Sequence, residues 1–543
     1  MHGLMMDTPL LISSLADHAA RNFGSREIVS ITADNPQHRY SYRECFARVK
    51  QLANALGKLG LEHGDRVATL CWNDYRHLEA YYAISGSGYV CHTINPRLFP
   101  EQQVFIVNHA EDRWIMTDVM FVPLLESLAD QFNGVEGFIV MTDAANMPET
   151  SLPNAHCYET LIASEPAEYD WPDLDERSAS ALCYTSGTTG DPKGVLYDHR
   201  STILHAYAGV APDVMSLSGL DCVMPVVPLF HVNAWGTPYS AVMVGAKIIF
   251  PGPKMGDGEA LFHLIQSEDV TLSLGVPTVW LAVLQYAEKE GKKLDSLRRT
   301  VIGGAAVPQF MIKEFRDKHD VEVRQGWGMT EMSPLGTVNT IKHGLDHLSD
   351  QERLDLRTKA GRGIFGVDMR IVDDEGKELP WDAEAYGALQ TRGPWVCNDY
   401  FKLDGSAGAH TDDGWFDTGD VATIDPEGYM AITDRTKDVI KSGGEWISSI
   451  ELENTAMGHA AVAEAAVVGI AHPKWTERPL LVVVKAEGQE VSKDELIGYY
   501  DGKVASWWIP DDVAFVDELP HTATGKVKKI ELRRQFADYQ FPE

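Results

Sequence analysis

Apolar positions recur at helical spacing between Tyr42 and Leu59, which predicts an amphipathic helix over 42–59. A short apolar run at 66–71 follows the turn pair Gly64-Asp65 and predicts a strand. Helical and strand-like segments continue to alternate along the chain. This alternation predicts a layered α/β fold, because parallel strands need helical crossovers between them.

The remaining patterns assign most of the chain to short elements. Helices are expected over 77–83, 119–130, 448–457 and 493–505, with another beginning near Pro308. Strands are expected over 114–117, 137–141, 181–184, 195–197, 222–226, 247–250, 272–274, 299–302, 463–470 and 480–484. Residues 142–175 are rich in Pro, Ala, Glu and Asp, so we interpret them as a surface connection. Residues 345–356 are polar and predict a helix or a loop.

At least two domains are expected, because 543 residues exceed what one hydrophobic core usually supports. Shorter strands over 367–372 and 387–391 predict an antiparallel β subdomain. The charged segment 434–438 is the expected boundary. The large domain, 1–434, would contain two layered α/β subdomains and the β subdomain, and a small α+β domain would span 435–543.

The formal charge of −32 argues against nucleic acid as a partner, since most of this surface would repel a polyanion. A phosphate-rich ligand would therefore need a locally basic pocket. No apolar run approaches the roughly 18 residues of a membrane span, so we expect no membrane insertion. Residues 1–21 lack the basic start of a secretory signal, and the seven cysteines contain no C-x-x-C pair. These features are typical of a reduced, cytoplasmic protein.

The strongest chemical signal is Thr185-Ser186-Gly187-Thr188-Thr189-Gly190-Asp191-Pro192-Lys193-Gly194. Glycines let backbone N–H groups turn toward an anion, hydroxyls add donors, and Lys193 adds positive charge. This composition favours a polyphosphate site over a solvated turn. A Walker loop is not indicated, because Lys193 is followed by Gly194 and strand-like residues rather than by Ser or Thr opening a helix.

This segment resembles the phosphate-binding signature of the adenylate-forming superfamily, which includes acyl- and aryl-CoA synthetases, luciferases and peptide-synthetase adenylation domains. The family's other signatures recur in order over nearly the whole chain. The resemblance implies ATP, Mg²⁺ and CoA as ligands, and a homodimer. It also implies that the ATP phosphates are bound by Thr185, Ser186, Gly187, Thr188, Thr189, Gly190 and Lys193, with Thr188 also near the metal.

Two further segments are implied to form the acid pocket. Pro228-Leu229-Phe230-His231-Val232-Asn233-Ala234-Trp235-Gly236 resembles the family's segment beside the carboxylate, with His231 near the acid and Trp235 as a gate. Composition alone would make His231 a core residue. Gly303-Gly304-Ala305-Ala306-Val307-Pro308 is implied to flank adenine and line the acid pocket, because small side chains permit close approach of a flat ring. Tight strand-to-helix packing is the alternative for this segment.

The segment Gln325-Gly326-Trp327-Gly328-Met329-Thr330-Glu331 is more specific. The resemblance implies that Trp327, with Gly328 and Met329, lies against the nucleotide, that Thr330 contacts the α-phosphate and that Glu331 binds Mg²⁺. One carboxylate is sufficient, because Mg²⁺ keeps most of its waters. Trp327 stands where tyrosine is usual, and its bulk favours a small or slender acid. Asp420 is implied to bind the ribose hydroxyls, and Arg435 the ribose or phosphates.

The C-terminal signatures imply a moving domain. Lys437 corresponds to the hinge, and Lys526 to the lysine of the adenylation step. The channel for CoA is implied to involve Lys441, Ser442, Gly443, Gly444, Glu445, Trp446 and Glu477. Glu477 belongs to a segment, 475–479, that resembles the loop approaching the thiol acceptor.

We therefore expect an AMP-forming acyl-CoA ligase that makes an acyl-adenylate and then a thioester. No protein nucleophile is needed, so Ser186 and His231 are not read as a catalytic triad. The segments 230–235 and 442–448 resemble bacterial medium- and long-chain fatty acyl-CoA synthetases and 3-methylmercaptopropionate-CoA ligases. Trp327 and the acidic surface favour 3-methylmercaptopropionate or another short acid, with a medium- or long-chain fatty acid as the alternative.

Other classes of protein remain open from the sequence. An adenylation enzyme that loads a carrier protein would be expected near a carrier domain. A luciferase-like oxygenase would share all of these motifs. A non-catalytic paralogue should have lost Lys526, Glu331 or Asp420, and all three are present.

Overall fold

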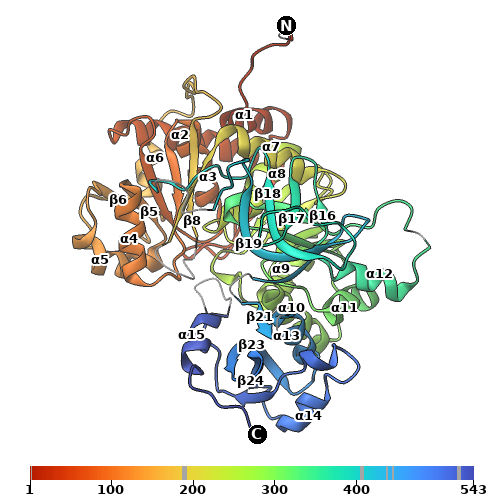
Figure 1. Cartoon of the computed structure of the whole chain (residues 1–543). Coiled ribbons are helices and arrows are strands. Elements are labelled where there is room, and N and C mark those ends of the chain that lie inside the picture. Colours follow the sequence, from red (N-terminus) through yellow and green to blue (C-terminus); the bar gives the residue numbers. More distant parts are fainter. Residues whose placement is uncertain are drawn as a thin grey trace.

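The structure, a computed structural model, describes the chain apart from residues 2, 186–191, 346, 404–408, 436–437, 443–444, 522–526 and 543, and apart from the side chains of Glu445 and Trp446. Two α/β units lie in the upper part of Figure 1, and the C-terminal residues form a separate unit at the bottom. The predicted α/β fold with a separate C-terminal domain is confirmed.

The first sheet contains seven strands in the order β7-β6-β5-β3-β4-β8-β9. Its strands are β3 (Arg66–Leu70), β4 (Val90–Thr93), β5 (Asp112–Thr117), β6 (Gly137–Val140), β7 (Ala155–Cys157), β8 (Ala179–Tyr184) and β9 (Gly194–Asp198). Neighbouring strands are parallel except β8 and β9, which form an antiparallel hairpin. Helices α4 (Pro100–Ala110) and α5 (Val122–Leu128) pack on one face of this sheet.

The second sheet contains nine strands in the order β16-β15-β14-β13-β12-β10-β11-β1-β2. Its strands are β1 (Glu27–Ser30), β2 (His38–Ser41), β10 (Cys222–Pro225), β11 (Lys247–Phe250), β12 (Leu272–Gly275), β13 (Arg299–Ile302), β14 (Glu322–Gly328), β15 (Leu335–Val338) and β16 (Arg362–Gly363). The strands from β14 to β1 are parallel, and β2, β15 and β16 add antiparallel edges. Helices α9 (Gly258–Ser267), α10 (Pro277–Glu290) and α11 (Gln309–His319) cover one face.

A layer of helices lies between the two sheets. It contains α1 (Ile12–Asn22), α2 (Tyr42–Lys58), α3 (Tyr75–Gly86), α7 (His199–Val210) and α8 (Thr237–Val244). Every residue of α3 is buried, as expected for a helix that is covered on all sides. One hydrophobic cluster joins this layer to both sheets, with Tyr81 from α3, Ile139 from β6 and Ile248 from β11 among its members. The large domain therefore alternates helices and sheets in five layers.

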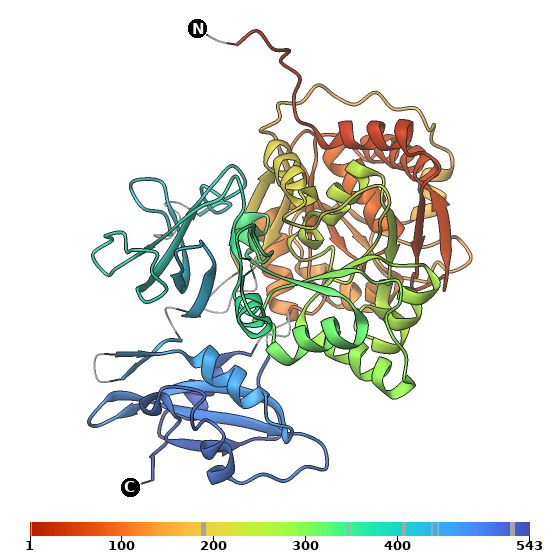
Figure 2. The same cartoon turned by 90° about the vertical axis from the view of Figure 1, so that its right-hand side faces the viewer.

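Two smaller sheets follow along the chain (Figure 2). The antiparallel sheet contains β17 (Asp368–Val372), β18 (Tyr386–Arg392), β19 (Phe416–Ile424) and β20 (Met430–Arg435). The C-terminal unit contains β21 (Ile440–Ser442), β22 (Glu445–Ile447), β23 (Val462–His472), β24 (Thr476–Lys485) and β25 (Asp512–Phe515), with α13 (Ser449–Met457), α14 (Lys493–Gly498) and α15 (Lys529–Gln535). The predicted boundary between 434 and 435 falls at the end of β20, and it stays a prediction.

Three local predictions were wrong. Residues 142–175 contain β7 and α6 (Tyr158–Ala163), which are too short to show a period in the sequence. The helix predicted over 493–505 ends at Gly498, and the following Gly502 has a φ of +72° that no helix accommodates. Residues 476–479 belong to β24 rather than to a loop. The polar segment 345–356 contains the first residues of α12 (Asp350–Arg357).

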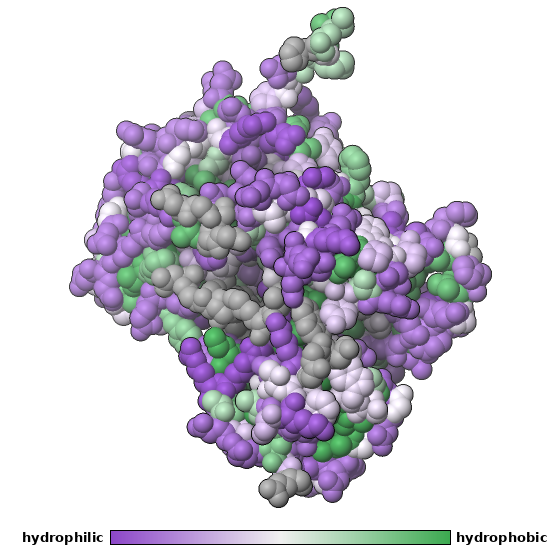
Figure 3. Space-filling view, viewed as in Figure 1, coloured by the Kyte–Doolittle hydropathy of each residue, from purple (hydrophilic) through white to green (hydrophobic). Residues whose placement is uncertain are grey.

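The surface agrees with the composition. The face seen in Figure 3 is mostly hydrophilic, as the formal charge of −32 predicts. Hydrophobic residues gather at the projecting N-terminal tail, where Leu4, Met5 and Met6 are almost fully exposed. None of the described helices combines the length and the apolar composition that crossing a membrane requires.

Several histidines are held neutral by the fold. Burial lowers the pKa from 6.5 to about 4 for His38, His77, His199 and His205. The His77 ring, for example, is fully buried on α3, with Nδ1 2.9 Å from the Trp72 carbonyl oxygen and Nε2 2.9 Å from Thr69 Oγ1. Between about pH 4 and 6.5 these groups bind fewer protons in the folded state than in the unfolded state.

The stability of the protein should therefore fall as the pH is lowered from about 6.5 to about 4. Calorimetric melting across this range should show a steady loss of Tm, and His77→Gln should flatten the dependence because it removes one of the groups. His263→Gln is the control, since this ring is more than half exposed. An unchanged pH dependence in His77→Gln would contradict the assignment.

Candidate active site

The glycine-rich segment closes on the β8–β9 hairpin. The Thr185 N–H donates to the Lys193 carbonyl oxygen at 2.9 Å, and the Lys193 N–H donates to Thr185 Oγ1 at 3.2 Å. These bonds bring the two ends of the segment together just beyond the pair Tyr184 and Gly194. The predicted phosphate contacts Ser186, Gly187, Thr188, Thr189 and Gly190 lie outside the described residues.

A tyrosine joins Lys193 to Glu331. The Lys193 ammonium lies 4.8 Å from the centroid of the Tyr400 ring, a distance typical of a cation–π contact. The Tyr400 hydroxyl donates to Glu331 Oε1 at 2.8 Å. Burial, followed by the Glu331 charge, raises the pKa of Tyr400, so its hydroxyl remains a donor. Sequence reasoning missed Tyr400, because it lies 69 residues beyond Glu331 in the chain.

The backbone of Thr330 and Glu331 is held from two sides. Both residues are buried at the start of a 3₁₀ turn, Thr330–Met332. The Tyr197 hydroxyl donates to the Thr330 carbonyl oxygen at 2.6 Å, and the Cys397 N–H donates to the Glu331 carbonyl oxygen at 2.7 Å. The turn is thus fixed between β9 and the segment that follows the antiparallel sheet's β18.

Trp327 and Arg435 meet at Asp420. The Trp327 Nε1–H donates to Asp420 Oδ2 at 2.8 Å, and Arg435 Nε forms an ion pair with Asp420 Oδ1 at 2.7 Å. The Asp420 carboxylate is 4% exposed, so its partners replace most of its water. The structure therefore brings together three residues that the sequence predicted to be near the nucleotide.

Two glycines leave space for the indole rings of Trp327 and Trp235. A Cβ at Gly336 would lie 2.6 Å from Trp327 Cζ3, and a Cβ at Gly303 would lie 3.1 Å from Trp235 Cη2. The same added Cβ at Gly303 would lie 2.8 Å from the Gly326 carbonyl oxygen. Gly304, by contrast, has a φ of +80°, which favours glycine for its backbone. Trp235, Gly303 and the β14 strand of Trp327 are thus neighbours, while Ala305 is exposed in the same loop.

Trp235 stands on a left-handed turn. The φ angles of Val232, Asn233, Ala234, Trp235 and Gly236 are +47, +50, +45, +56 and +74°. Each residue with a side chain costs about 1–2 kcal/mol in this region. Backbone strain of this kind persists only where surrounding contacts hold it, and it clusters at functional sites. No feature of the sequence predicted this conformation.

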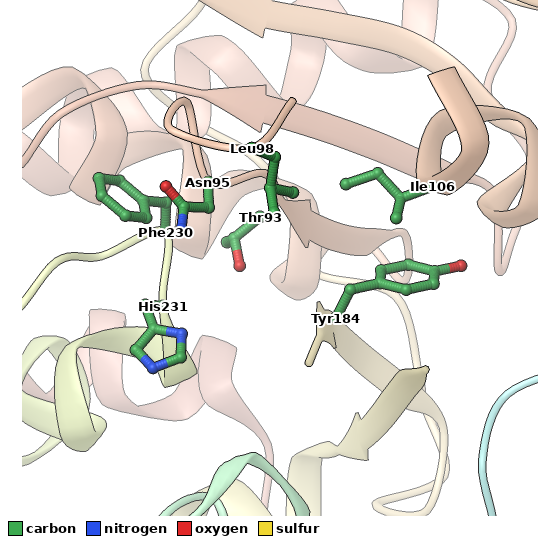
Figure 4. A pocket seen from close by; sticks show the side chains of 7 residues that line it. All are labelled: Thr93, Asn95, Leu98, Ile106, Tyr184, Phe230 and His231. Atoms are coloured by element: carbon green, nitrogen blue, oxygen red, sulfur yellow. The ribbon is translucent and has the colours of Figure 1, made fainter. Parts of the chain in front are cut away.

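His231 belongs to a small pocket beside the hairpin (Figure 4). The pocket is lined by Thr93, Asn95, Leu98, Ile106, Tyr184, Phe230 and His231. These residues come from the end of β4 and the loop after it, the middle of α4, the end of β8 and the segment before the left-handed turn. Tyr184 connects the pocket to the hairpin, and its hydroxyl lies 2.7 Å from His109 Nδ1.

Three of the predicted CoA-channel residues, Lys441, Ser442 and Glu477, lie on paired strands of the C-terminal unit. The Lys441 N–H donates to Glu477 Oε2 at 2.9 Å, and Ser442 pairs with Thr476 of the neighbouring strand. Gly443 and Gly444 lie outside the described residues, and Glu445 and Trp446 are placed only as backbone of β22. The predicted hinge Lys437 and the predicted adenylation residue Lys526 also lie outside the described residues.

Comparison with known proteins identifies the family. Residues 16–401 match the AMP-binding enzyme family, and residues 451–526 match the AMP-binding enzyme C-terminal domain. The chain belongs to the AMP-binding enzymes.

This AMP-binding enzyme is similar to curated ligases over its full length. It is 54% identical over 538 residues to a 3-methylmercaptopropionyl-CoA ligase of Ruegeria lacuscaerulensis, with 99% of both chains covered. It is 51% identical over 539 residues to a medium-chain-fatty-acid–CoA ligase of Ectopseudomonas oleovorans, with 99% of this chain and 98% of the relative covered. The anthranilate CoA ligase AuaEII in complex with anthranoyl-AMP has a TM-score of 0.86 and 25% identity, over 97% of this chain and 98% of that one. The predicted superfamily and the predicted class of acid–thiol ligase are confirmed.

Gly336→Ala should disturb the contact between Trp327 and Asp420 in this AMP-binding enzyme. The added methyl group would meet the indole at 2.6 Å, and overpacking of this kind costs about 1–3 kcal/mol. We expect a lower Tm and a higher KM for ATP. The matched control is Gly57→Ala in α2, where a Cβ meets no atom within 4 Å. If both variants are equally stable and equally active, the indole is not tightly packed against Gly336.

Proposed function

We propose that this AMP-binding enzyme joins a short carboxylic acid to CoA with the conversion of ATP to AMP and pyrophosphate, and that 3-methylmercaptopropionate is its acid. The observation that carries the proposal is the full-length similarity to a ligase of that acid, at 54% identity. The bulk of Trp235 against Gly303, and of Trp327 in strand β14, supports a short acid. A medium-chain fatty acid is the second candidate, because the similarity to the Ectopseudomonas ligase is nearly as high.

The first half-reaction requires positioning more than covalent chemistry. The acid carboxylate attacks the α-phosphorus of ATP, and the bond to pyrophosphate breaks, which leaves an acyl-adenylate. Asp420 is proposed to accept the ribose hydroxyls, because its buried carboxylate is oriented by Trp327 and Arg435. Lys193 and the glycine-rich segment would bind the phosphates, and Thr330 the α-phosphate. Such preorganised charge is the main source of rate in this type of reaction.

Glu331 fits the binding of Mg²⁺. Its carboxylate is almost fully buried, and the Tyr400 hydroxyl donates to Oε1. Among the described residues no group of three or more His, Cys, Asp or Glu side chains could form a metal cage. A single carboxylate suits Mg²⁺ that is otherwise held by phosphates and water. When bound, Mg²⁺ would neutralise phosphate charge, and Thr188 is proposed to lie near it.

The second half-reaction forms the thioester. The CoA thiol attacks the acyl carbon, and the bond to the adenylate oxygen breaks, which releases AMP. We propose that the C-terminal unit rotates about Lys437 between the two steps, that Lys526 serves only the first, and that the strands around Lys441, Ser442 and Glu477 line the CoA channel. His231 is proposed to lie beside the acid rather than to act as an acid or base.

The location and the oligomeric state of the enzyme are also part of the proposal. A cytoplasmic location is supported by the cysteines, all seven of which are free thiols. The homodimer stays a prediction.

The acid can be identified by AMP release with 3-methylmercaptopropionate and straight-chain acids of increasing length, with and without CoA. We expect the highest kcat/KM with the short acids and AMP turnover that depends on CoA. Trp235→Ala and Trp327→Ala should shift the preference toward longer acids, since one methylene in an apolar pocket changes kcat/KM by about 10–200-fold. An equal loss for all acids in both variants would contradict the role of these tryptophans.

The contribution of the Tyr400 hydroxyl to ATP binding can be separated from the packing of the Tyr400 ring. Tyr400→Phe keeps the ring beside Lys193 but removes the hydroxyl from Glu331, and a hydrogen bond to a charged group contributes about 1.5–3 kcal/mol. We expect KM for ATP to rise by roughly tenfold or more, with a stronger dependence on Mg²⁺ concentration. Tyr429→Phe is the control, because it also loses a buried hydroxyl bond, to the Thr340 carbonyl oxygen. The same kinetic effect in both variants would refute the proposal.

A further inference from the structure

The left-handed turn 232–236 is held by side chains from the other α/β unit. Asn73, fully buried just beyond β3, accepts from the Leu229 N–H at 2.6 Å and donates to the carbonyl oxygens of Pro225 and Val227 at 3.0 and 2.8 Å. These three bonds fix the chain that leads from β10 into the turn. A carboxamide that makes them all cannot be replaced by a purely apolar side chain without leaving buried backbone groups unpaired.

The Tyr81 hydroxyl contacts the turn itself. The Tyr81 hydroxyl, fully buried on α3, donates to the Leu229 carbonyl oxygen and lies 3.1 Å from Asn233 Oδ1. The Ala234 N–H donates to the carbonyl oxygens of Pro228 and His231 at 3.1 and 3.2 Å. At the end of the turn, Thr237 Oγ1 donates to the Ala234 carbonyl oxygen at 2.6 Å.

His205 connects the turn to the strand beside Trp327. A Cβ at Gly236 would lie 2.6 Å from the His205 ring, so the ring packs directly on the backbone of the turn. His205 Nε2 accepts from the Leu335 N–H at 3.3 Å, next to the Gly336 that supports Trp327. One buried imidazole therefore contacts both the turn that carries Trp235 and the strand that pairs with the strand of Trp327.

We propose that Asn73, Tyr81 and His205 are positioning residues that hold the turn 232–236 in its left-handed form, keep the Trp235 indole against Gly303, and thereby set the length of acid that the enzyme accepts. The last part of this inference rests on the proposed function. Strain explains why the holding contacts are needed, since Val232, Asn233, Ala234 and Trp235 would otherwise relax to negative φ.

The first test compares two alanines that both have positive φ. Ala234 has a φ of +45° inside the turn, and Ala383 has a φ of +68° on the exposed loop between β17 and β18. Glycine should relieve strain at either position, so neither Ala234→Gly nor Ala383→Gly should lower Tm. Because glycine adopts positive φ without this strain, Ala234→Gly should restore part of the preference for short acids that is lost with the Tyr81 hydroxyl, whereas Ala383→Gly should restore none.

The second test compares neighbouring tyrosines on α3. Tyr81→Phe removes the hydroxyl that holds the turn, and Tyr82→Phe removes a hydroxyl that donates to the Pro238 carbonyl oxygen in α8 at 2.8 Å. Both side chains are fully buried, so both variants should lose stability to a similar extent. Only Tyr81→Phe should change the preference among acids.

A readout that does not depend on turnover is the ¹⁹F spectrum of enzyme labelled with 5-fluorotryptophan, with the Trp235 line assigned from Trp235→Phe. The line should broaden or split in Tyr81→Phe, sharpen again when Ala234→Gly is added, and stay unchanged in Tyr82→Phe and Ala383→Gly. An unchanged line and unchanged preference in Tyr81→Phe would overturn the inference. The Trp235 line could change in Tyr81→Phe while the wild-type enzyme converts no acid. That result would support the positioning role, but the proposed function and the assignment of specificity would both be wrong.

Discussion

The sharing of one helical layer by two parallel sheets is the constraint on which the site depends. In a parallel sheet the loops at the carboxyl ends of the strands lie along one edge, and ligands bind there. Asn73 follows β3, Thr93 ends β4, and Tyr184 ends β8 of the first sheet. Because helix α3 is buried between the sheets, its Tyr81 reaches the loop that follows β10 of the second. The proposed site therefore lies where loops of both sheets meet.

Positive side chains lie in the predicted nucleotide site although the whole molecule carries a large negative charge. The formal charge of −32 would repel ATP from most of the surface, yet Lys193 and Arg435 lie within the predicted nucleotide site. Each is oriented by a neighbour, Lys193 by the Tyr400 ring and Arg435 by Asp420. Because Tyr400 also holds Glu331, the groups proposed to bind phosphate and metal are connected through a single side chain. Such a connection limits how far either group can move without the other.

Specificity for the acid, in this proposal, depends on small residues and strain as much as on the tryptophans themselves. Gly303 and Gly336 leave space for the two indoles, and neither position tolerates a Cβ without movement of its neighbours. The left-handed turn directs Trp235 toward Gly303, and contacts from α3 and α7 offset its strain. A pocket built in this way could change its length through residues that never touch the acid.

The sequence by itself determined the class of fold and the chemical inventory of the site. The alternation of apolar segments predicted the α/β layers, because hydrophobic period reflects burial directly. Glu331, Asp420 and Lys193 could be proposed as site residues because each stands in a segment that resembles a signature of the family. Short elements such as β7 and α6 were missed, since a segment of so few residues shows no period.

Only the tertiary structure decided which residues hold the proposed site residues in position. Tyr400, Asn73, Tyr81 and His205 act through contacts with residues that are distant in the chain, and no local pattern marks them. The left-handed turn could not be read from Val232-Asn233-Ala234-Trp235, whose residue types favour negative φ. Its conformation is imposed from outside, because the energy of the surrounding packing and hydrogen bonds exceeds the local preference of the backbone.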